Sequence, residues 1–426
     1  MAEPLPFKLV MDNVHGHIRL SPLAEKIINT TIFKRLKGIH QLQGLHEVFP
    51  TANHKRFEHS LGTMHLARRL CQSLKVSKED TELVAVAGLC HDLGHGPFSH
   101  LWEAFVREQG GTWNHEESSF KMLLLTMEEN PDIKLTPEDL TFIKELICGG
   151  DEEKIKKKEY PYKARGTEHF FLYEIISNKK TGIDVDKMDY MARDSRALGV
   201  PIMFDFDRFV EAGEPIILDG PLFQDSDIIV KRVAVRDKVV RNVQHLYQDR
   251  TNLHSSAYQH KTSTVFDRMY LDLWGLADRF ITVAGRDGRM LVLSEAHQDE
   301  VALARLTDDW LHQTIRNSTS GDLEPARDLL RRIDQRQLYK IVAHIENTAV
   351  PEEACSDELK KLSSTPEILA VVKVKIQMGK GGRNPVEKML FYEKGSLTGK
   401  KKTPEELKRF VPQEISHQEL LVLSKE

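Results

Sequence analysis

An apolar segment at residues 81–92, TELVAVAGLCHD, predicts a buried helix that ends in a histidine and an aspartate. Ser77 and Asp80 stand before it with the Ser-x-x-Asp spacing of a capping box, and the glycines and proline of the following LGHGP stop the helix. A helix that is apolar on all sides is normally surrounded by protein. The pattern therefore places His91 and Asp92 in the interior or on the floor of a pocket.

Most of the first 345 residues read as further helices, and strands gather toward the end of the chain. Helices are expected at 138–148, 170–177, 186–194, 237–246 and 252–281. Strands are expected at 227–235 and 372–378, with 379–382 and 389–392 as the loop and return strand of a hairpin. A change of composition across 348–366 indicates a linker. We therefore expect a mainly α fold, with a helical domain at 1–345 and a small α+β C-terminal lobe at 346–426.

Composition narrows the class of protein. The 426 residues are 40% hydrophobic and 29% charged with a net charge of −4, so nucleic-acid binding would depend on local patches. The four cysteines are far apart in sequence, which argues against a disulfide framework or a zinc ribbon. The chain has neither an apolar run long enough for a membrane span nor the features of a signal peptide at its start. We expect an intracellular protein, in the nucleus or cytoplasm, with no membrane partner.

The candidate chemistry is concentrated around the end of the apolar segment. Residues 89–100, LCHDLGHGPFSH, hold His91, Asp92, His95 and His100 within ten positions. His59 stands upstream, and Asp186 lies downstream in IDVDKMDYMARD. Together they form an H…HD…D set whose burial would be costly without a compensating metal or ligand. Imidazoles and carboxylates suit first-row divalent metals, so the pattern predicts a metal site.

A metal site of this kind suits the hydrolysis of a polyphosphate. A divalent metal lowers the pKa of bound water toward about 7 and so supplies hydroxide at neutral pH. Arg56, Lys187 and Arg250 are candidates to hold the phosphate charge. A histidine suits protonation of the leaving oxygen. On the helix from Asp186, the side chains at 187, 190 and 194 share one face.

The motifs HD, GHGPFSH and DVDKxDYxxRD resemble those of the deoxynucleoside triphosphate (dNTP) triphosphohydrolases of the HD superfamily. Residues 250–261, RTNLHSSAYQHK, are similar to the animal branch that carries a SAM and an HD domain. The resemblance runs from Lys8 to Tyr392 and does not include a SAM domain. It implies an HD-domain helical core and the hydrolysis of a dNTP to a deoxynucleoside and triphosphate.

The resemblance also implies a role for individual residues. The metal, which would be iron, zinc or manganese with magnesium nearby, would be held by His59, His91, Asp92 and Asp186. The α-phosphate would contact His95 and His115, and His100, oriented by the residue at position 103, would protonate the leaving oxygen. The triphosphate would be bound by Arg56, Lys187, Tyr190 and Arg250. The sugar 3′-hydroxyl would be read by Gln41 and Asp194, and Tyr258 would exclude ribonucleotides by its bulk.

Activation by GTP or dNTPs, which bridge subunits into a homotetramer built as a dimer of dimers, is a further implication. The matching positions are Lys8, Asn29, Lys34, Lys37, Val48, Phe49, Arg208, Arg236, Lys238, Asn242, His260, Lys261, Arg336, Lys340 and Arg383. The resemblance also allows weak binding of single-stranded nucleic acid. The lysine runs 156–158 and 400–402 read as solvated loops.

The chain departs from the family pattern at several of these positions. Glu103 stands where the family has the aspartate that orients the catalytic histidine, and one added methylene alters that contact. In the first activator site, Asn29 replaces a guanine-reading aspartate, and Lys34 and Lys37 replace a glutamine and an arginine. We therefore expect an altered guanine preference in that site.

Two other functions stay open at this point. A different HD enzyme, such as a cyclic-nucleotide or alarmone phosphohydrolase, would share the metal set but would not need the sugar contacts of Tyr258 and Asp194. A non-catalytic nucleotide sensor or nucleic-acid-binding scaffold would fit the change at Glu103. The intact set of metal-site and pocket histidines counts against the scaffold.

Overall fold

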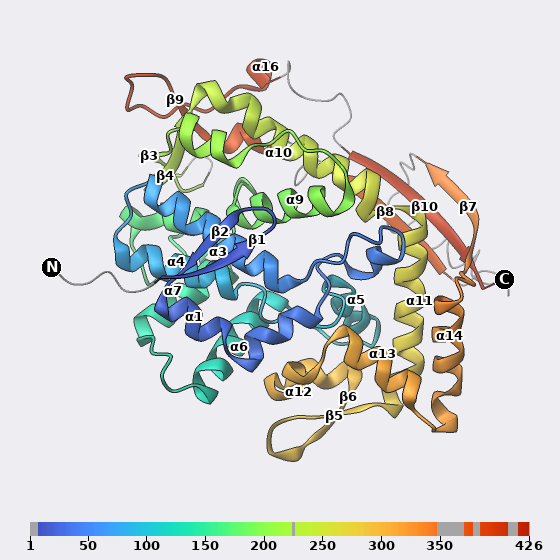
Figure 1. Cartoon of the computed structure of the whole chain (residues 1–426). Helices are drawn as coiled ribbons and strands as arrows, with labels where there is room; N and C mark the ends of the chain where they lie inside the picture. Colours follow the sequence, from blue (N-terminus) through green and yellow to red (C-terminus); the bar gives the residue numbers. More distant parts are fainter. Residues whose placement is uncertain (1–6, 224–225, 347–369, 378–383, 408–415, 426) are drawn as a thin grey trace.

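A computed structural model describes the chain apart from residues 1–6, 224–225, 347–369, 378–383, 408–415 and 426. The described part is mainly helical with a few small sheets, as expected (Figure 1). The main helices are α1 Pro22–Ile28, α3 Arg56–Ser73, α4 Lys78–Cys90, α5 His100–Glu108, α6 His115–Glu129, α7 Pro137–Cys148, α9 Val185–Leu198, α10 Val240–Leu253, α11 Lys261–Ala277, α13 Asp308–Asn317 and α14 Glu324–Asp334. The shorter helices are α2 Thr31–Lys34, α8 Glu152–Lys156, α12 Glu300–Arg305 and α16 Pro404–Leu407.

The strands form four small sheets. Two are antiparallel pairs, β1 Lys8–Asp12 with β2 Gly16–Leu20, and β5 Thr282–Ala284 with β6 Met290–Val292. The third has the order β3-β4-β9, from Ile216–Pro221, Ile229–Arg236 and Leu390–Tyr392. The fourth has the order β7-β10-β8, from Lys340–Glu346, Ser416–Ser424 and Ala370–Gln377.

The predicted apolar helix forms as α4, but it ends two residues before the expected Asp92. The Ser77 hydroxyl accepts a hydrogen bond from the backbone N–H of Asp80, which caps the first turn of α4. Every residue of α4 from Leu83 to Cys90 is buried. It packs chiefly on α3, with α7 on another side. The helix ends at Cys90, so His91 and Asp92 lie in the turn that follows, at the edge of the hydrophobic core.

Two of the expected helices differ from those in the structure. Residues 252–281 were expected as one helix, but α10 ends at Leu253, one π-helical turn follows at His254–Tyr258, and α11 begins at Lys261 with His260 as its cap. The break lets both flanking helices turn side chains into one pocket. Residues 170–177 were expected as an α-helix, and the structure instead has a 3-10 helix at Thr167–Glu174.

The expected hairpin between 372–378 and 389–392 was also wrong. The first of these strands, β8, pairs antiparallel with β10, and the second, β9, pairs parallel with β4. The expected loop at 379–382 and the whole of the linker at 348–366 lie outside the described residues. Two of the sheets take strands from both sides of residue 346, and the domain division at that point stays a prediction. In the described part of the chain, no helix combines the length and the hydropathy needed to cross a membrane.

Candidate active site

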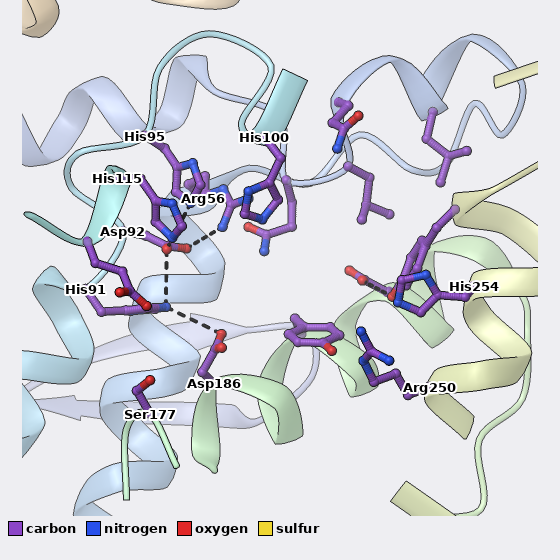
Figure 2. A pocket seen from close by; sticks show the side chains of 18 of the residues that line it. Arg56, His91, Asp92, His95, His100, His115, Ser177, Asp186, Arg250 and His254 are labelled. Carbon is purple, nitrogen blue, oxygen red and sulfur yellow. Dashed lines mark hydrogen bonds and ion pairs between the residues drawn. The ribbon is translucent and has the colours of Figure 1, made fainter. Parts of the chain in front are cut away.

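The first turns of α3 and α9 and the turn after α4 meet at the H…HD…D set. His59 comes from α3 and Asp186 from α9, and their Nε2 and Oδ1 atoms lie 3.1 Å apart. His91 Nε2 lies 3.5 Å from the same Asp186 oxygen, and His59 Nε2 lies 3.4 Å from Asp92 Oδ2. Figure 2 shows His91, Asp92 and Asp186 on one side of the pocket, with their polar atoms directed toward one another. The four expected metal ligands therefore converge on one point.

Contacts behind these ligands fix their orientation. His59 Nδ1 lies 2.7 Å from Asp189 Oδ2, and His91 Nδ1 lies 2.8 Å from the carbonyl oxygen of Gly88. Because each imidazole donates through Nδ1, its Nε2 presents a lone pair to the cluster. Neither buried Nε2 has a hydrogen-bond partner in the described part of the chain. Two unpartnered ring nitrogens and two carboxylates are the donor set of a divalent transition metal, so the residues fit that group.

Asp189 is itself held in place by two basic side chains that do not line the pocket. Arg193 Nη2 lies 3.0 Å from Asp189 Oδ1, and His15 Nε2 lies 2.6 Å from the same oxygen. The carboxylate is fully buried. Burial would raise its pKa, but Arg193, His15 and His59 hold the pKa of Asp189 well below its usual range. Asp189 therefore stays ionised and keeps His59 in one tautomer.

The charges of the metal site strengthen one another. Burial would lower the pKa of His59, but Asp186 and Asp189 raise it to about 10. Burial would raise the pKa of Asp92, but Arg56 and the histidines hold it well below its usual range. Arg56 Nη1 donates to Asp92 Oδ2 at 2.6 Å. The site thus keeps its carboxylates ionised, and the negative charge that favours a proton on His59 would equally favour a metal cation in place of that proton.

Three further histidines lie together beside the metal site. His95 stacks on His115 with ring centres 4.1 Å apart, and His100 lies 5.0 Å from His95 and 5.3 Å from His115. His95 is fully buried and contacts Asp92 at 3.3 Å. Burial, Arg56 and His115 hold the pKa of His95 well below its usual range, so its ring is neutral. Figure 2 shows all three rings over the same side of the pocket.

Glu103 connects two of these histidines. Its Oε1 lies 2.5 Å from His115 Nδ1, and its Oε2 lies 3.5 Å from His100 Nδ1. Burial would raise the pKa of Glu103, but the hydrogen bonds from His100 and His115 hold it far below its usual range. The longer side chain therefore still reaches His100, at the outer limit of a hydrogen bond, while it contacts His115 more closely.

The metal site opens into a pocket of about 350 Å³. Of the residues expected in an active site, the ones that line it are Gln41, Arg56, His91, Asp92, His95, His100, His115, Asp186, Tyr190, Asp194, Arg250 and Tyr258. Asp194 is fixed from two sides, because His54 Nε2 lies 2.7 Å from its Oδ1 and the Tyr258 hydroxyl donates to its Oδ2. One chamber thus holds nearly all the expected phosphate and sugar contacts.

Lys187 lines a second pocket rather than the first. This pocket also has a volume of about 350 Å³ and shares Asp186, Arg250, Ser177 and Glu116 with the first. Lys187 Nζ lies 3.1 Å from Asp184 Oδ2. The other cations that line the second pocket are Lys179, Lys180 and Lys388. Lys187 and Tyr190 were expected on one face of their helix. Tyr190 lines the first pocket and Lys187 lines the second, which adjoins the first at Asp186 and Arg250.

None of the described residues expected to bind an activating nucleotide lines either pocket. Arg236 and Lys238 both contact Glu214, Phe49 packs edge-on against His260, and Lys8 pairs with Glu25. Asn242 donates to the carbonyl oxygen of Asp205, Lys261 lies 2.9 Å from His344, and Arg336 donates to the carbonyl oxygen of Glu47. Asn29, Lys34, Lys37, Val48, Arg208 and Lys340 lie on separate elements, and Arg383 lies outside the described residues. Their role as activator sites stays a prediction.

Sequence reasoning missed several residues of the site. Asp189 and His54 position expected residues, and His254, Ser263 and Asp267 line the pocket. Asp189 could have been found from its position three residues after Asp186 on the same helix. His254 could have been found four residues after Arg250. The contact between His54 and Asp194 joins residues that are 140 apart, and no local pattern signals it.

Comparison with known proteins agrees with this geometry. The HD domain family model matches residues 56–193. The chicken protein "Deoxynucleoside triphosphate triphosphohydrolase SAMHD1" is 36% identical over 98% of this chain and 72% of its own length. The human protein of the same name is 38% identical over 90% of this chain and 65% of its own length. The Dictyostelium discoideum homolog is 30% identical over 97% of this chain and 77% of its own length.

Proposed function

This chain belongs to the SAMHD1-type family of HD-domain dNTP triphosphohydrolases, and from that premise we propose that it cleaves dNTPs into a deoxynucleoside and triphosphate. The observation that carries the proposal is the convergence of two imidazoles and two carboxylates. They stand beside a pocket whose lining includes arginines and the polar side chains expected to contact a sugar. Water adds to the α-phosphorus, the bond to the 5′ oxygen breaks, and that oxygen takes a proton.

His59, His91, Asp92 and Asp186 would hold the metal. When bound, it supplies Lewis acidity and a nucleophilic water at neutral pH. We propose iron, zinc or manganese for this set, because imidazole ligands suit transition metals, with magnesium on the phosphates. Arg56 stays paired with Asp92 and faces the pocket, so it can neutralise phosphate charge there.

The proton comes from the histidine group beside the metal site. Glu103 touches both His100 and His115 and so holds both rings in place. We assign donation to His100, because half of its side chain is exposed at the pocket rim, where it can regain a proton from solvent. Neutral His95 is left to donate a hydrogen bond to the α-phosphate. If His115→Gln abolishes turnover and His100→Gln does not, the proton donor is His115.

The sugar contacts favour a deoxyribose. The Asp194 carboxylate is held by His54 and Tyr258, so it is positioned to accept from a 3′-hydroxyl. Gln41 Oε1 is buried and has no partner in the described part of the chain, which leaves it free for the same hydroxyl. The ring of Tyr258 lines the pocket next to Asp194 and would clash with a 2′-hydroxyl.

The triphosphate tail extends from the metal site into the second pocket. Arg250 and Asp186 line both pockets, and Lys187 lines the second. Burial would lower the pKa of Lys187, but Asp184 and Asp186 raise it, so the ammonium stays charged. Arg250 and Lys187 along this path would bind the phosphates and leave the metal-site carboxylates available to the metal.

Regulation by nucleotides and assembly into a homotetramer are part of the proposal. The support is the family resemblance and the spread of Lys and Arg at the matching positions. Size-exclusion chromatography with GTP, with each dNTP and without nucleotide tests it, and a monomer under all three conditions would contradict it. A nuclear or cytoplasmic location and weak binding of single-stranded nucleic acid are proposed on the same resemblance.

The test of the activity uses purified protein with each dNTP and manganese or iron, with and without GTP. Chromatography should show a deoxynucleoside and triphosphate in equal amounts. His91→Ala should abolish both products. Diphosphate or monophosphate products would point to another HD hydrolase. If no dNTP is turned over under any condition, the non-catalytic scaffold is favoured.

A further inference from the structure

The pocket also contains polar atoms that the proposed reaction does not use. Ser263 and Asp267 lie four residues apart on α11, and both line the pocket. Ser263 Oγ and Asp267 Oδ1 are buried and have no hydrogen-bond partner in the described part of the chain. Residues four apart on a helix face the same way, so the two oxygens form a pair. Buried oxygens without partners are uncommon and call for a ligand.

The Asp267 carboxyl group is also isolated from positive charge. Within the described residues, no lysine, arginine or histidine forms an ion pair with it, and burial raises the pKa of Asp267 to about 7. The backbone N–H of Gly44 is the one group that lowers the pKa of Asp267, and it offsets only part of the effect of burial. An acid kept in this environment lowers the stability of the protein at neutral pH, which indicates a functional reason to retain it.

The surroundings of this pair suit a flat, polar-edged ring. Leu42 and Leu45 line the same pocket and offer apolar contact. His254 also lines it, and Figure 2 shows that residue on the side away from the metal cluster, near Arg250. Burial and Arg250 lower the pKa of His254 to about 3, so it adds no charge. The deoxyribose contacts of Asp194 and Tyr258 lie in the same chamber.

We propose that Ser263 and Asp267 read the Watson–Crick edge of the substrate's nucleobase and favour guanine. The inference rests on the proposed dNTP hydrolysis and adds a specificity site to it. Two buried acceptors side by side match two adjacent N–H donors. Guanine presents N1–H beside its 2-amino group, whereas adenine, cytosine and thymine each present a single donor group with an acceptor next to it on that edge. A base that cannot fill both oxygens leaves one unpaired, which weakens binding.

The test compares Asp267→Asn and Ser263→Ala with the wild-type protein on all four dNTPs. Asp267→Asn should raise the KM for dGTP about tenfold and leave kcat within about twofold, since the metal site is untouched. Ser263→Ala should raise the same KM about threefold to fivefold. The KM for dTTP should change less than twofold in both variants. Thr264→Ala and Asp272→Asn, on the same helix but outside the pocket lining, are the matched controls.

Binding of the product nucleosides separates this inference from the proposed function. Calorimetry with deoxyguanosine and thymidine needs no turnover, and deoxyguanosine should bind the wild-type protein at least fivefold more tightly. That preference should disappear in Asp267→Asn. Equal affinities in the wild-type protein, or an equal loss for all four dNTPs in Asp267→Asn, would overturn the inference. An absence of dNTP turnover with the nucleoside preference intact would contradict only the proposed function.

Discussion

Two groups of residues at the pocket differ in how their polar groups are paired: the metal-site residues, called the metal end, and the pair Ser263 and Asp267, called the unpaired end. At the metal end, His59 contacts Asp186 and Asp189, and Asp92 contacts Arg56, so every charge has an opposite charge within 3.5 Å. At the unpaired end, Ser263 Oγ and Asp267 Oδ1 are buried, and within the described residues no positively charged side chain pairs with Asp267. The first end is organised before a ligand arrives, and the second is completed by the ligand. We expect the first to control the rate of chemistry and the second to control the choice of substrate.

The largest effect should come from removing a metal ligand. Asp186→Ala takes away the carboxylate that both His59 and His91 approach. We expect loss of bound transition metal and a fall in kcat of at least a thousandfold, as removal of the activated water implies. Elemental analysis and the rate of dGTP hydrolysis measure the two effects. Retention of metal together with normal turnover would show that the catalytic centre lies elsewhere.

A smaller effect at the same end should come from Asp189→Asn. This change removes the charge behind His59 but leaves all four ligands in place. Loss of such an outer contact typically weakens metal affinity by about 10-fold to 100-fold. Competition with a chelator measures the affinity, and circular dichroism checks that the variant is folded. An unchanged metal affinity in a folded variant would remove Asp189 from the account.

The unpaired end should respond in stability rather than in rate. Burial raises the pKa of Asp267 from 3.8 to about 7, so the folded state holds this proton more tightly than the unfolded state. The contribution of Asp267 to the free energy of unfolding is then greatest below about pH 4 and is lost as the pH rises toward 7. The loss is about 4 kcal/mol at most. Without nucleotide, Asp267→Asn should therefore be more stable than the wild-type protein at pH 8.

Urea unfolding of both proteins at pH 5 and pH 8 tests this sign. The difference in unfolding free energy should be larger at pH 8 than at pH 5. A variant that is less stable than the wild-type protein at pH 8 would show that Asp267 has a compensating partner. Asp272→Asn serves as the control, because Asp272 already pairs with Arg268 and should lose stability at both pH values.

The smallest effect should come from Lys388 at the border of the second pocket. Lys388 is exposed, and no carboxylate pairs with it among the described residues. Its attraction for a triphosphate is therefore screened by water and salt. Lys388→Ala should raise the KM for dNTPs about twofold to threefold at low salt and have no effect at 0.5 M salt. A tenfold effect that persists at high salt would place Lys388 in direct contact with substrate.

The sequence predicted the parts of this site that depend on local patterns. His91 and Asp92 follow an apolar helix, and Asp186 begins another, so their positions could be inferred from neighbouring residues. The contacts of Asp189 with His15 and of Asp194 with His54 could not, because they join segments 174 and 140 residues apart. Position 103 shows the same limit. A contact with His100 was expected from the family resemblance, whereas the closer contact with His115 depends on how α5 meets α6.

The fold follows the same division. Helices with a capped start and a buried face, such as α4 and α7, were predicted within a few residues. The pairing of β9 with β4 was not, because parallel pairing of short distant strands leaves no signal in either strand. The π-helical turn at His254–Tyr258 was also missed, since the residues on both sides keep a helical pattern. Because His254 and Tyr258 of this turn line the pocket, the shape of the pocket was harder to predict from the sequence than the metal ligands were.

The most direct test of the central claim is hydrolysis of dGTP in water enriched in oxygen-18, followed by mass spectrometry of both products. If water attacks the α-phosphorus as proposed, one labelled oxygen should appear in the triphosphate and none in the deoxyguanosine. Label in the deoxyguanosine would mean attack at the sugar carbon. Formation of labelled diphosphate or monophosphate, with no triphosphate, would contradict the proposed reaction.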